Sequence, residues 1–246
     1  MQIPPTTGPA IPATPAPGGG GGDFPDPLLD WASSSETFGA GAGSYTIGGL
    51  SVTYDLAGGS APDSIALTAG VLAVDCSGGG QAYLVIDLGE ALTDEIAYLY
   101  ATSTSYVADT TSGWILSLCD DTSIGNYGGH LQASVGHAGT ETSIKFRECT
   151  DDSPLTFVDI STETVTDVST TPTRVCMMWH GASGSMSWDQ GSATLPTDGE
   201  HLTNQVSSDY NDGTGAATRA GRRYVHILVK TSADIRLSAG ALRAAS

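Results

Sequence analysis

Short runs of alternating apolar and polar residues, separated by turns rich in glycine, dominate this chain from residue 44 to residue 242. The clearest run, residues 223–230 (RYVHILVK), places Val225, Ile227 and Val229 on one face of a strand. No stretch shows a helical period over more than a turn or two. About twelve short strands at intervals of roughly 8 to 15 residues therefore predict an all-β fold, an antiparallel β-sandwich.

The other expected strands differ in how clearly the sequence marks them. Residues 92–100 could form a helix, but the alternation of Ile96, Tyr98 and Tyr100 favours a strand. Residues 195–220 are rich in Thr, Asp, Asn and Gly, which predicts a long surface loop. The expected strands are residues 44–56 (broken at Gly48 and Gly49), 65–74, 82–88, 92–100, 114–119, 130–137, 142–149, 155–160, 164–168, 173–180, 185–189, 223–230 and 235–242.

Residues 1–27 have a different composition from the rest of the chain. They contain eight of the twelve prolines and a run of five glycines, Gly18 to Gly22, and residues 1–22 carry no charged side chain. Proline fixes φ and removes a backbone donor, which predicts an extended arm that cannot fold alone. We expect residues 28–246 to form one sandwich domain and the arm to anchor it in an assembly. The arm residues expected to make contact are Ile3, Pro4, Pro5, Pro9, Ile11, Pro12, Pro15 and Pro17.

The formal net charge is -18, and it is distributed unevenly. Residues 23–218 carry a net charge of -23, whereas residues 219–246 carry +5. This basic segment either balances the acidic domain internally or docks on a neighbouring copy through Arg219, Arg222 and Arg223. The overall acidity argues against nucleic acid or an anionic membrane as a partner.

Targeting and cysteine signals are sparse. The N-terminus has no basic start and no apolar core of a secretory signal, and no apolar run is long enough to span a membrane. Cys76, Cys119, Cys149 and Cys176 lack C-x-x-C spacing, so we expect buried, reduced thiols. Disulfides remain an alternative if the protein functions outside the cell.

No residue pattern nominates a catalytic site. The acidic cluster at residues 90–95 lacks the i, i+2 spacing of paired carboxylates on a strand face, and no serine lies in a G-x-S-x-G motif. The histidines are isolated, and a hydrogen-bonded structural role is expected for them, including His226 in the middle of a strand. We predict a protein that is not an enzyme and needs no cofactor.

The sequence does not predict a metal site. Asp209, Asn211 and Asp212 resemble the start of a calcium loop, but Gly213 occupies the fifth ligand position and no distal Glu follows. An Asn/Asp/Gly turn explains the segment better.

Aromatic residues are a usual platform for sugars, but most of them fall in expected strands. Trp114, Trp179 and Trp188 are predicted core residues. Trp31 and Tyr210 are the candidates that remain for sugar contact.

Two resemblances refine these expectations. The hairpin RVCMMWHGASGSMSWDQG, residues 174–191, is similar to the late hairpin of concanavalin A-like and laminin G-like sandwiches, with Asp189-Gln190-Gly191 in place of a closing D-G. This implies a concanavalin A-like sandwich, and a jelly roll is the alternative. The order of arm, acidic β domain and short tail resembles auxiliary virion proteins of tailed bacteriophages, which implies a capsid-decorating or tail-attached role.

Together these observations predict a structural virion protein that decorates or stabilises a phage capsid through its arm. Its partners would be neighbouring copies, in a homo-oligomer, and major capsid or tail subunits. It would be assembled in the host cytoplasm and reside in the virion. The alternative is a glycan-binding sandwich of a tail fibre or other appendage.

Overall fold

The strands form two sheets in a computed structural model that describes residues 28–92, 96–106, 113–119, 131–136, 142–152, 155–180, 183–194, 202–206, 222–230 and 232–242. One sheet contains β1 (Leu29–Asp30), β2 (Glu36–Thr37), β5 (Ser64–Thr68), β6 (Val71–Asp75), β8 (Ile96–Tyr106), β13 (Thr173–His180), β14 (Ser183–Gln190), β15 (Asn204–Val206) and β17 (Ala233–Leu242). The other contains β3 (Gly43–Ile47), β4 (Leu50–Asp55), β7 (Ala82–Leu92), β9 (Trp114–Cys119), β10 (Leu131–Val135), β11 (Ser143–Asp152), β12 (Leu155–Thr164) and β16 (Arg222–Val229).

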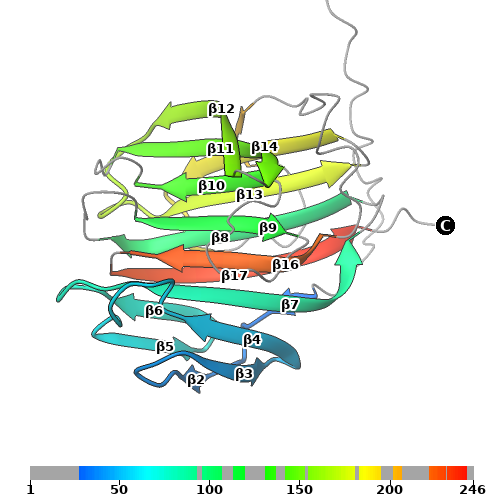
Figure 1. The fold of residues 1–246 in the computed structure, drawn as a ribbon. Helices are drawn as coiled ribbons and strands as arrows, with labels where there is room; N and C mark the ends of the chain where they lie inside the picture. Colours follow the sequence, from blue (N-terminus) through cyan, green and yellow to red (C-terminus); the bar gives the residue numbers. More distant parts are fainter. Residues whose placement is uncertain are drawn as a thin grey trace, which may run out of the picture.

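The two sheets pack face to face as the layers of an antiparallel sandwich (Figure 1). The nine-stranded sheet runs β15-β14-β13-β8-β17-β6-β5-β2, with β1 added beside β17. The eight-stranded sheet runs β12-β11-β10-β9-β16-β7-β4-β3. Strands distant in the sequence are neighbours in both sheets: β16 lies between β9 and β7, and β17 lies between β8 and β6. The predicted all-β antiparallel sandwich is confirmed.

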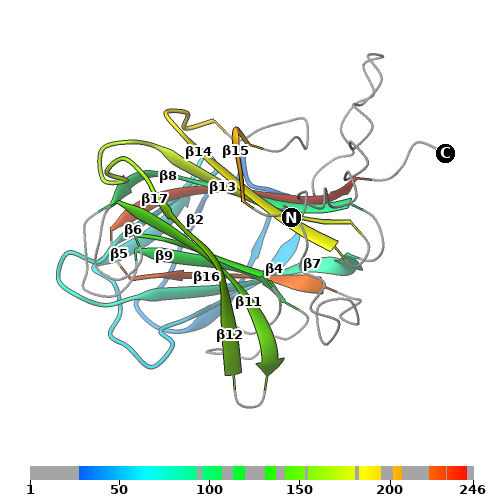
Figure 2. The ribbon, with the colours of Figure 1, turned by 90° about the horizontal axis from the view of Figure 1, so that it is seen from above.

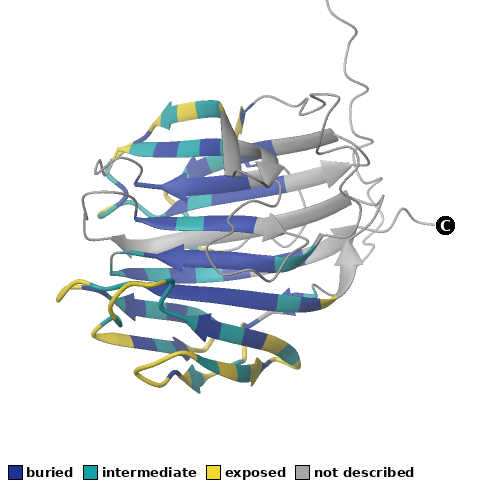
Figure 3. Cartoon of the chain, viewed as in Figure 1, coloured by how far each residue is buried: buried dark blue, intermediate teal, exposed yellow. Residues whose placement is uncertain are grey.

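The core lies between the sheets and contains the apolar residues of each alternating strand. In β16, Val225, Ile227 and Val229 are buried against it, on the face that the sequence predicts. Leu84 and Ile86 of β7 lie on the same face because they pair with Ile227 and Val225. The strands β7, β9, β10 and β16 are unusual because their outward residues are also largely buried (Figure 3). This second buried face belongs to the middle of the eight-stranded sheet.

Three of the expected strands differ from those observed. Residues 65–74 form a hairpin, β5 and β6, because Ala69 (φ 47°) and Gly70 (φ 78°) both adopt positive φ, which is the requirement of a tight hairpin turn. Residues 165–168 are not a separate strand, since β12 ends at Thr164 and a turn follows it. Residues 92–100 are not one strand, since residue 92 ends β7 and β8 begins at Ile96 and continues to Tyr106. Part of the expected surface loop at residues 195–220 is the strand β15, in which Val206 is buried. The other expected strands within the described ranges are present with shifts of up to four residues at their ends.

The hairpin formed by β11 and β12 departs from the plane of its sheet. Figure 2 shows its far end projecting away from the nine-stranded sheet. The register of the two strands shifts between Phe146 and Arg147 and again between Cys149 and Asp151. Bulges of this kind bend a strand and increase its twist. They turn the hairpin toward the outer side of the eight-stranded sheet.

Within the part of the chain described, no helix has the length and apolar character needed to cross a membrane.

Candidate functional site

The outer face of the eight-stranded sheet carries a row of polar residues that crosses five adjacent strands. His226 of β16 is opposite Ser117 of β9, and Ser117 is opposite Gln132 of β10. Gln132 is in turn opposite Arg147 of β11, which is opposite Asp159 of β12. Paired residues in an antiparallel sheet share a face, so the register aligns all five side chains. We refer to these five residues as the polar row.

A second row runs beside it, one pair further along the strands. Leu228 of β16 is opposite Ile115 of β9, which is opposite Ser134 of β10, and Ser134 is opposite Lys145 of β11. The apolar half of this row belongs to a small cluster with Tyr83. The polar half, Ser134 and Lys145, lies directly beside Gln132 and Arg147. The polar groups are therefore concentrated over β10 and β11.

The polar side chains at the centre of this face are buried. Ser117, Gln132, Ser134 and His226 are exposed by 2% or less. Oε1 of Gln132 and Oγ of Ser134 have no hydrogen-bond partner among the residues described. A buried polar atom without a partner costs on the order of 1–3 kcal/mol, so native proteins tolerate few of them. Gln132 and Ser134 are two positions apart on β10 and therefore lie on the same face. The loss of stability that they cause is concentrated at one place on the sheet.

His226 is held in place by Tyr83 of the neighbouring strand β7. The Tyr83 hydroxyl and Nδ1 of His226 are hydrogen-bonded, and the two rings meet edge to face with centroids 5.6 Å apart. Both side chains are buried. The hydrogen bond expected for His226 is therefore present. The contact also fixes the ring at the end of the polar row.

At the other end of the row, two cations share one carboxylate. Nζ of Lys145 lies 2.6 Å from Oδ2 of Asp159, and Nε of Arg147 lies 3.2 Å from Oδ1. The hydrogen bond from Lys145 is the largest influence that lowers the pKa of the Asp159 carboxyl, and the charges of both cations add to it. Asp159 is consequently ionised at neutral pH. The site thus combines two cations, one carboxylate, an amide and several hydroxyl groups.

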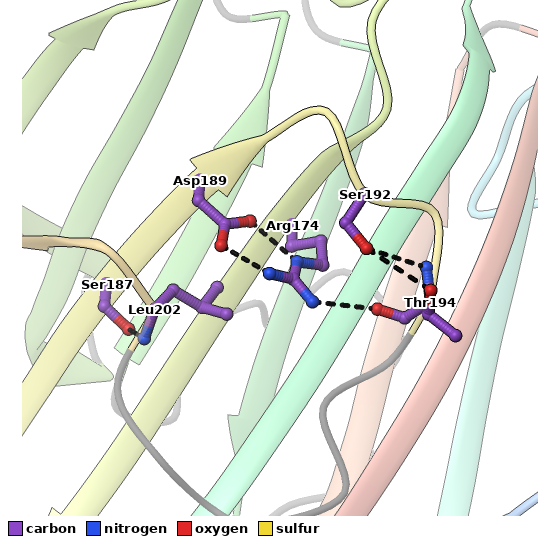
Figure 4. Close-up of polar contacts among 6 residues, drawn as sticks. All are labelled: Arg174, Ser187, Asp189, Ser192, Thr194 and Leu202. Carbon is purple, nitrogen blue, oxygen red and sulfur yellow. Dashed lines mark hydrogen bonds and ion pairs between the residues drawn. The ribbon is translucent and has the colours of Figure 1, made fainter.

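The nine-stranded sheet has its own polar cluster, in which the charged groups of Arg174 and Asp189 are paired by hydrogen bonds (Figure 4). Arg174 donates from Nε to Oδ1 of Asp189 over 2.7 Å, and a second guanidinium nitrogen reaches Oδ2 at 2.5 Å. A third nitrogen donates to the carbonyl oxygen of Thr194 over 3.0 Å. Nearby, Oγ of Ser187 accepts a hydrogen bond from the Leu202 amide at 3.0 Å. This cluster ties β13, β14 and the following segments together.

The basic residues predicted to make contacts are only partly described. Arg223 forms two hydrogen bonds with Asp87 of the adjacent strand, at 2.5 and 2.7 Å. For Arg223 this favours the interpretation of charge balance within the chain. Arg222 pairs through its backbone with Leu92, its side chain lies outside the described set, and Arg219 lies outside the described residues. Docking on a neighbouring copy stays a prediction.

Several other predicted residues lie outside the described ranges. They are the arm residues Ile3, Pro4, Pro5, Pro9, Ile11, Pro12, Pro15 and Pro17, the calcium-loop residues Asp209, Asn211 and Asp212, and the aromatic residue Tyr210. Among the described residues, no group of three His, Cys, Asp or Glu side chains could hold a metal ion.

The prediction that Trp31 is available to a sugar is wrong. Its side chain is 1% exposed and belongs to the core. β1 pairs with β17, and Leu29 beside Trp31 is fully buried, so the start of the domain packs into the sandwich. Trp114 is a core residue as predicted, and Trp188 packs against the core. The polar row escaped prediction because its members come from five separate stretches of sequence.

Comparison with solved structures places this architecture in a known fold. The exoplasmic/lumenal domain of VIP36 in its Ca²⁺/Man2-bound form matches with a TM-score of 0.53 and 11% identity, over 79% of this chain and 82% of that one. The metal-free form of the same domain matches with a TM-score of 0.51 and 11% identity, over 79% and 86%. The chain has the concanavalin A-like lectin fold. The carbohydrate recognition domain of Emp46p also matches, with a TM-score of 0.49 and 9% identity over 77% and 87%.

No protein-family model matches the sequence, and no curated protein matches it either. At 11% identity the likeness to VIP36 concerns the fold alone. The phage resemblance of the overall layout gains no support from these comparisons. The chemistry of the site must therefore be argued from the residues of this chain.

Proposed function

We propose that this protein binds a carbohydrate on the outer face of its eight-stranded sheet. The observation that carries the proposal is the pair of adjacent buried acceptors, Gln132 Oε1 and Ser134 Oγ, which lack partners among the described residues. Sugar hydroxyls donate and accept hydrogen bonds, so they can satisfy both atoms. Binding would then recover a cost that the free protein bears.

The arrangement of the other polar groups supports a ligand with many hydroxyls. Neighbouring strands are about 4.8 Å apart, so the polar row offers one amide, hydroxyl or charged group per strand at intervals comparable with the width of a sugar ring. His226 and Ser117 continue the row beyond Gln132 on one side. Small-molecule sites combine apolar walls with a few polar groups that fix orientation. Leu228, Ile115 and Tyr83 provide the apolar part of this face.

The comparison adds support of a general kind. The matched VIP36 domain was solved with mannose-containing ligands, and the Emp46p domain is named as a carbohydrate recognition domain. The present fold is thus one on which such binding occurs. A glycan-binding sandwich was the alternative interpretation of the sequence, and the chemistry of the polar row favours it.

The substitution Gln132→Leu tests this proposal with opposite effects on binding and stability. The Gln132 amide has a buried oxygen without a partner, so replacing it with an apolar side chain of similar size should leave the free energy of unfolding unchanged or raise it by about 1 kcal/mol. Binding to a glycan array should fall below detection. Urea denaturation of the full chain measures the first effect, and the array measures the second.

The matched control is Gln190→Leu on the nine-stranded sheet. Gln190 donates to the Thr166 carbonyl at 2.8 Å and accepts from the Thr166 amide at 2.8 Å. This variant should lose about 1–3 kcal/mol of stability and keep its glycan binding. Glycan binding that survives in Gln132→Leu, or a wild-type chain that binds no glycan, would contradict the proposal.

The predicted virion role concerns the arm rather than this face. We retain as a proposal that the arm attaches the domain to a capsid or tail assembly, and glycan binding by the domain is compatible with it. A domain carried on a particle surface and facing outward could present the polar row to sugars.

A further inference from the structure

We infer that the free edge of β3 pairs with the same edge of a second copy of this chain, so that two eight-stranded sheets join into one. The inference is independent of the proposed glycan site. β3 is the last strand of its sheet, and among the described strands only β4 pairs with it (Figure 1). Its other side presents a row of backbone groups that can pair with another strand.

The β3–β4 hairpin determines which backbone groups point to this free edge. Its loop is Gly48 and Gly49, both at positive φ (58° and 83°), as in a two-residue type I′ turn. Such a turn hydrogen-bonds the two residues that flank it, and hydrogen-bonded pairs then alternate along the ladder. The amide and carbonyl groups of Ser44 and Thr46 therefore point away from β4. Both residues are exposed.

β3 differs from the other strands that end the described sheets. β2 and β15, the ends of the nine-stranded sheet, are only two and three residues long. β12, at the far end of the eight-stranded sheet, is bulged twice against β11 and carries Asp159 and Glu163. Short strands, bulges and charges are devices by which proteins block pairing at an edge. β3 has five residues, a register without shifts, no charge and no proline.

Small residues leave the approach to this edge open. The chain enters β3 through residues 39–42 (GAGA) and leaves it through Gly48 and Gly49. A Cβ on Gly41 or Gly49 would meet nothing within 4 Å. Gly49 needs its positive φ, but Gly41 has none, so neither backbone angle nor crowding within the chain requires a glycine at residue 41. Glycine allows another backbone to pass close by, which pairing at this edge requires.

The charge and the order of the side chains favour a second copy as the partner. Residues 37–54 carry no charged side chain, although the chain as a whole has a net charge of -18 that repels other copies. Antiparallel pairing about a two-fold axis at Tyr45 places Ser44 of each copy opposite Thr46 of the other. Hydroxyl residues then face hydroxyl residues, and the two Tyr45 side chains meet at the axis. Cross-strand pairs of these kinds stabilise antiparallel strands.

Analytical ultracentrifugation of the full chain over the micromolar range tests the inference. A single pair of edge strands buries less area than a standard interface, so we expect a weak dimer whose mass falls to that of the monomer on dilution. The double variant Ser44→Glu/Thr46→Glu places like charges opposite each other twice and should weaken dimerisation about tenfold or more. Ser44→Lys/Thr46→Lys should weaken it as well. An equimolar mixture of the two variants should dimerise again, because glutamates then lie opposite lysines.

The matched control is Thr162→Glu/Thr164→Glu at the opposite edge of the same sheet. These two threonines of β12 are exposed and two positions apart, as Ser44 and Thr46 are. This variant should dimerise like the wild type, and far-UV circular dichroism checks that every variant is folded. A wild-type chain that stays monomeric, a Ser44→Glu/Thr46→Glu variant that associates as strongly as the wild type, or a mixture that stays monomeric would overturn the inference. None of these outcomes bears on the proposed glycan site, which Gln132→Leu tests separately.

Discussion

At the scale of single residues, burial and hydrogen bonding separate the polar side chains that are paired from those that have an atom without a partner. Arg174 and Asp189 are close to buried, and their charged atoms contact each other. Gln132 and Ser134 are more completely buried, yet each has an atom without a partner in the described structure. Paired residues such as Arg174 and Asp189 stabilise the fold, and no further role is needed to explain them. The second kind costs stability. Buried atoms without a partner also occur on core aromatic residues such as Trp31 and Trp114, so it is the position of Gln132 and Ser134 on the outer face that leads us to propose a ligand.

The pairing of Asp87 with Arg223 leads to a prediction about acid stability. The hydrogen bonds from Arg223 lower the pKa of the Asp87 carboxyl in the folded chain. A lowered folded pKa stabilises the protein above the ordinary Asp pKa of about 3.9, and this contribution is lost as pH falls through the folded value. Asp87→Asn should therefore lower stability at pH 7 and weaken its dependence on pH below about 4.

Urea denaturation of both chains from pH 7 down to pH 3 measures this effect. Arg223→Ser should show the same pattern in the isolated chain, because it removes the same contacts. A wild-type curve with the same pH dependence as Asp87→Asn would show that the contact contributes nothing to stability. If Arg223→Ser weakens only self-association and leaves the stability of the isolated chain unchanged, its interpretation as an internal partner is wrong.

At the scale of elements, the turns decide which strands pair in register. The alternation of apolar and polar residues predicted most strands correctly, because every second residue of a strand faces the core. It missed the hairpin at residues 65–74, where the two strands form one nearly continuous apolar run. The turn at Ala69 and Gly70 divides that run. Such a turn depends on two backbone angles, which leave only a faint mark in the sequence.

Gly80 and Gly79 provide a matched test of turn geometry. Both have positive φ, +121° and +85°. A Cβ on Gly80 would lie 2.3 Å from the Ala61 carbonyl oxygen, whereas a Cβ on Gly79 would meet nothing within 4 Å. Gly79→Ala should thus cost about 1 kcal/mol for its backbone angle alone. Gly80→Ala should cost about 3 kcal/mol or more, because the overlap involves backbone that cannot turn aside. Urea denaturation distinguishes them, and equal costs would contradict the geometry.

At the scale of the whole molecule, a sandwich domain that carries the polar row is joined to an arm of different composition. The described strands begin at Leu29, and Trp31 anchors the start of the domain in the core. Every described strand and every residue of the polar row therefore lies after residue 27 in the sequence. Attachment and recognition would then reside in different parts of one chain.

Deleting residues 2–22 tests this separation. The shortened chain should keep the unfolding temperature and the glycan binding of the full chain, since every described strand is retained. If the arm is the anchor, the shortened chain should no longer co-sediment with capsid or tail assemblies that retain the full chain. Unimpaired co-sedimentation would rule out the anchoring role, and a lower unfolding temperature would show that the arm belongs to the fold.

The sequence by itself determined most of the strands, their buried faces and the all-β class, because these depend on neighbours one or two positions away. It also marked His226 as a histidine in the middle of a strand. Only the tertiary structure decided that Ser117, Gln132, Arg147 and Asp159 align with it. Strand order and register bring these positions together across long separations in sequence, and no local pattern encodes them. The tertiary structure likewise buried Trp31, because burial depends on what packs against a residue.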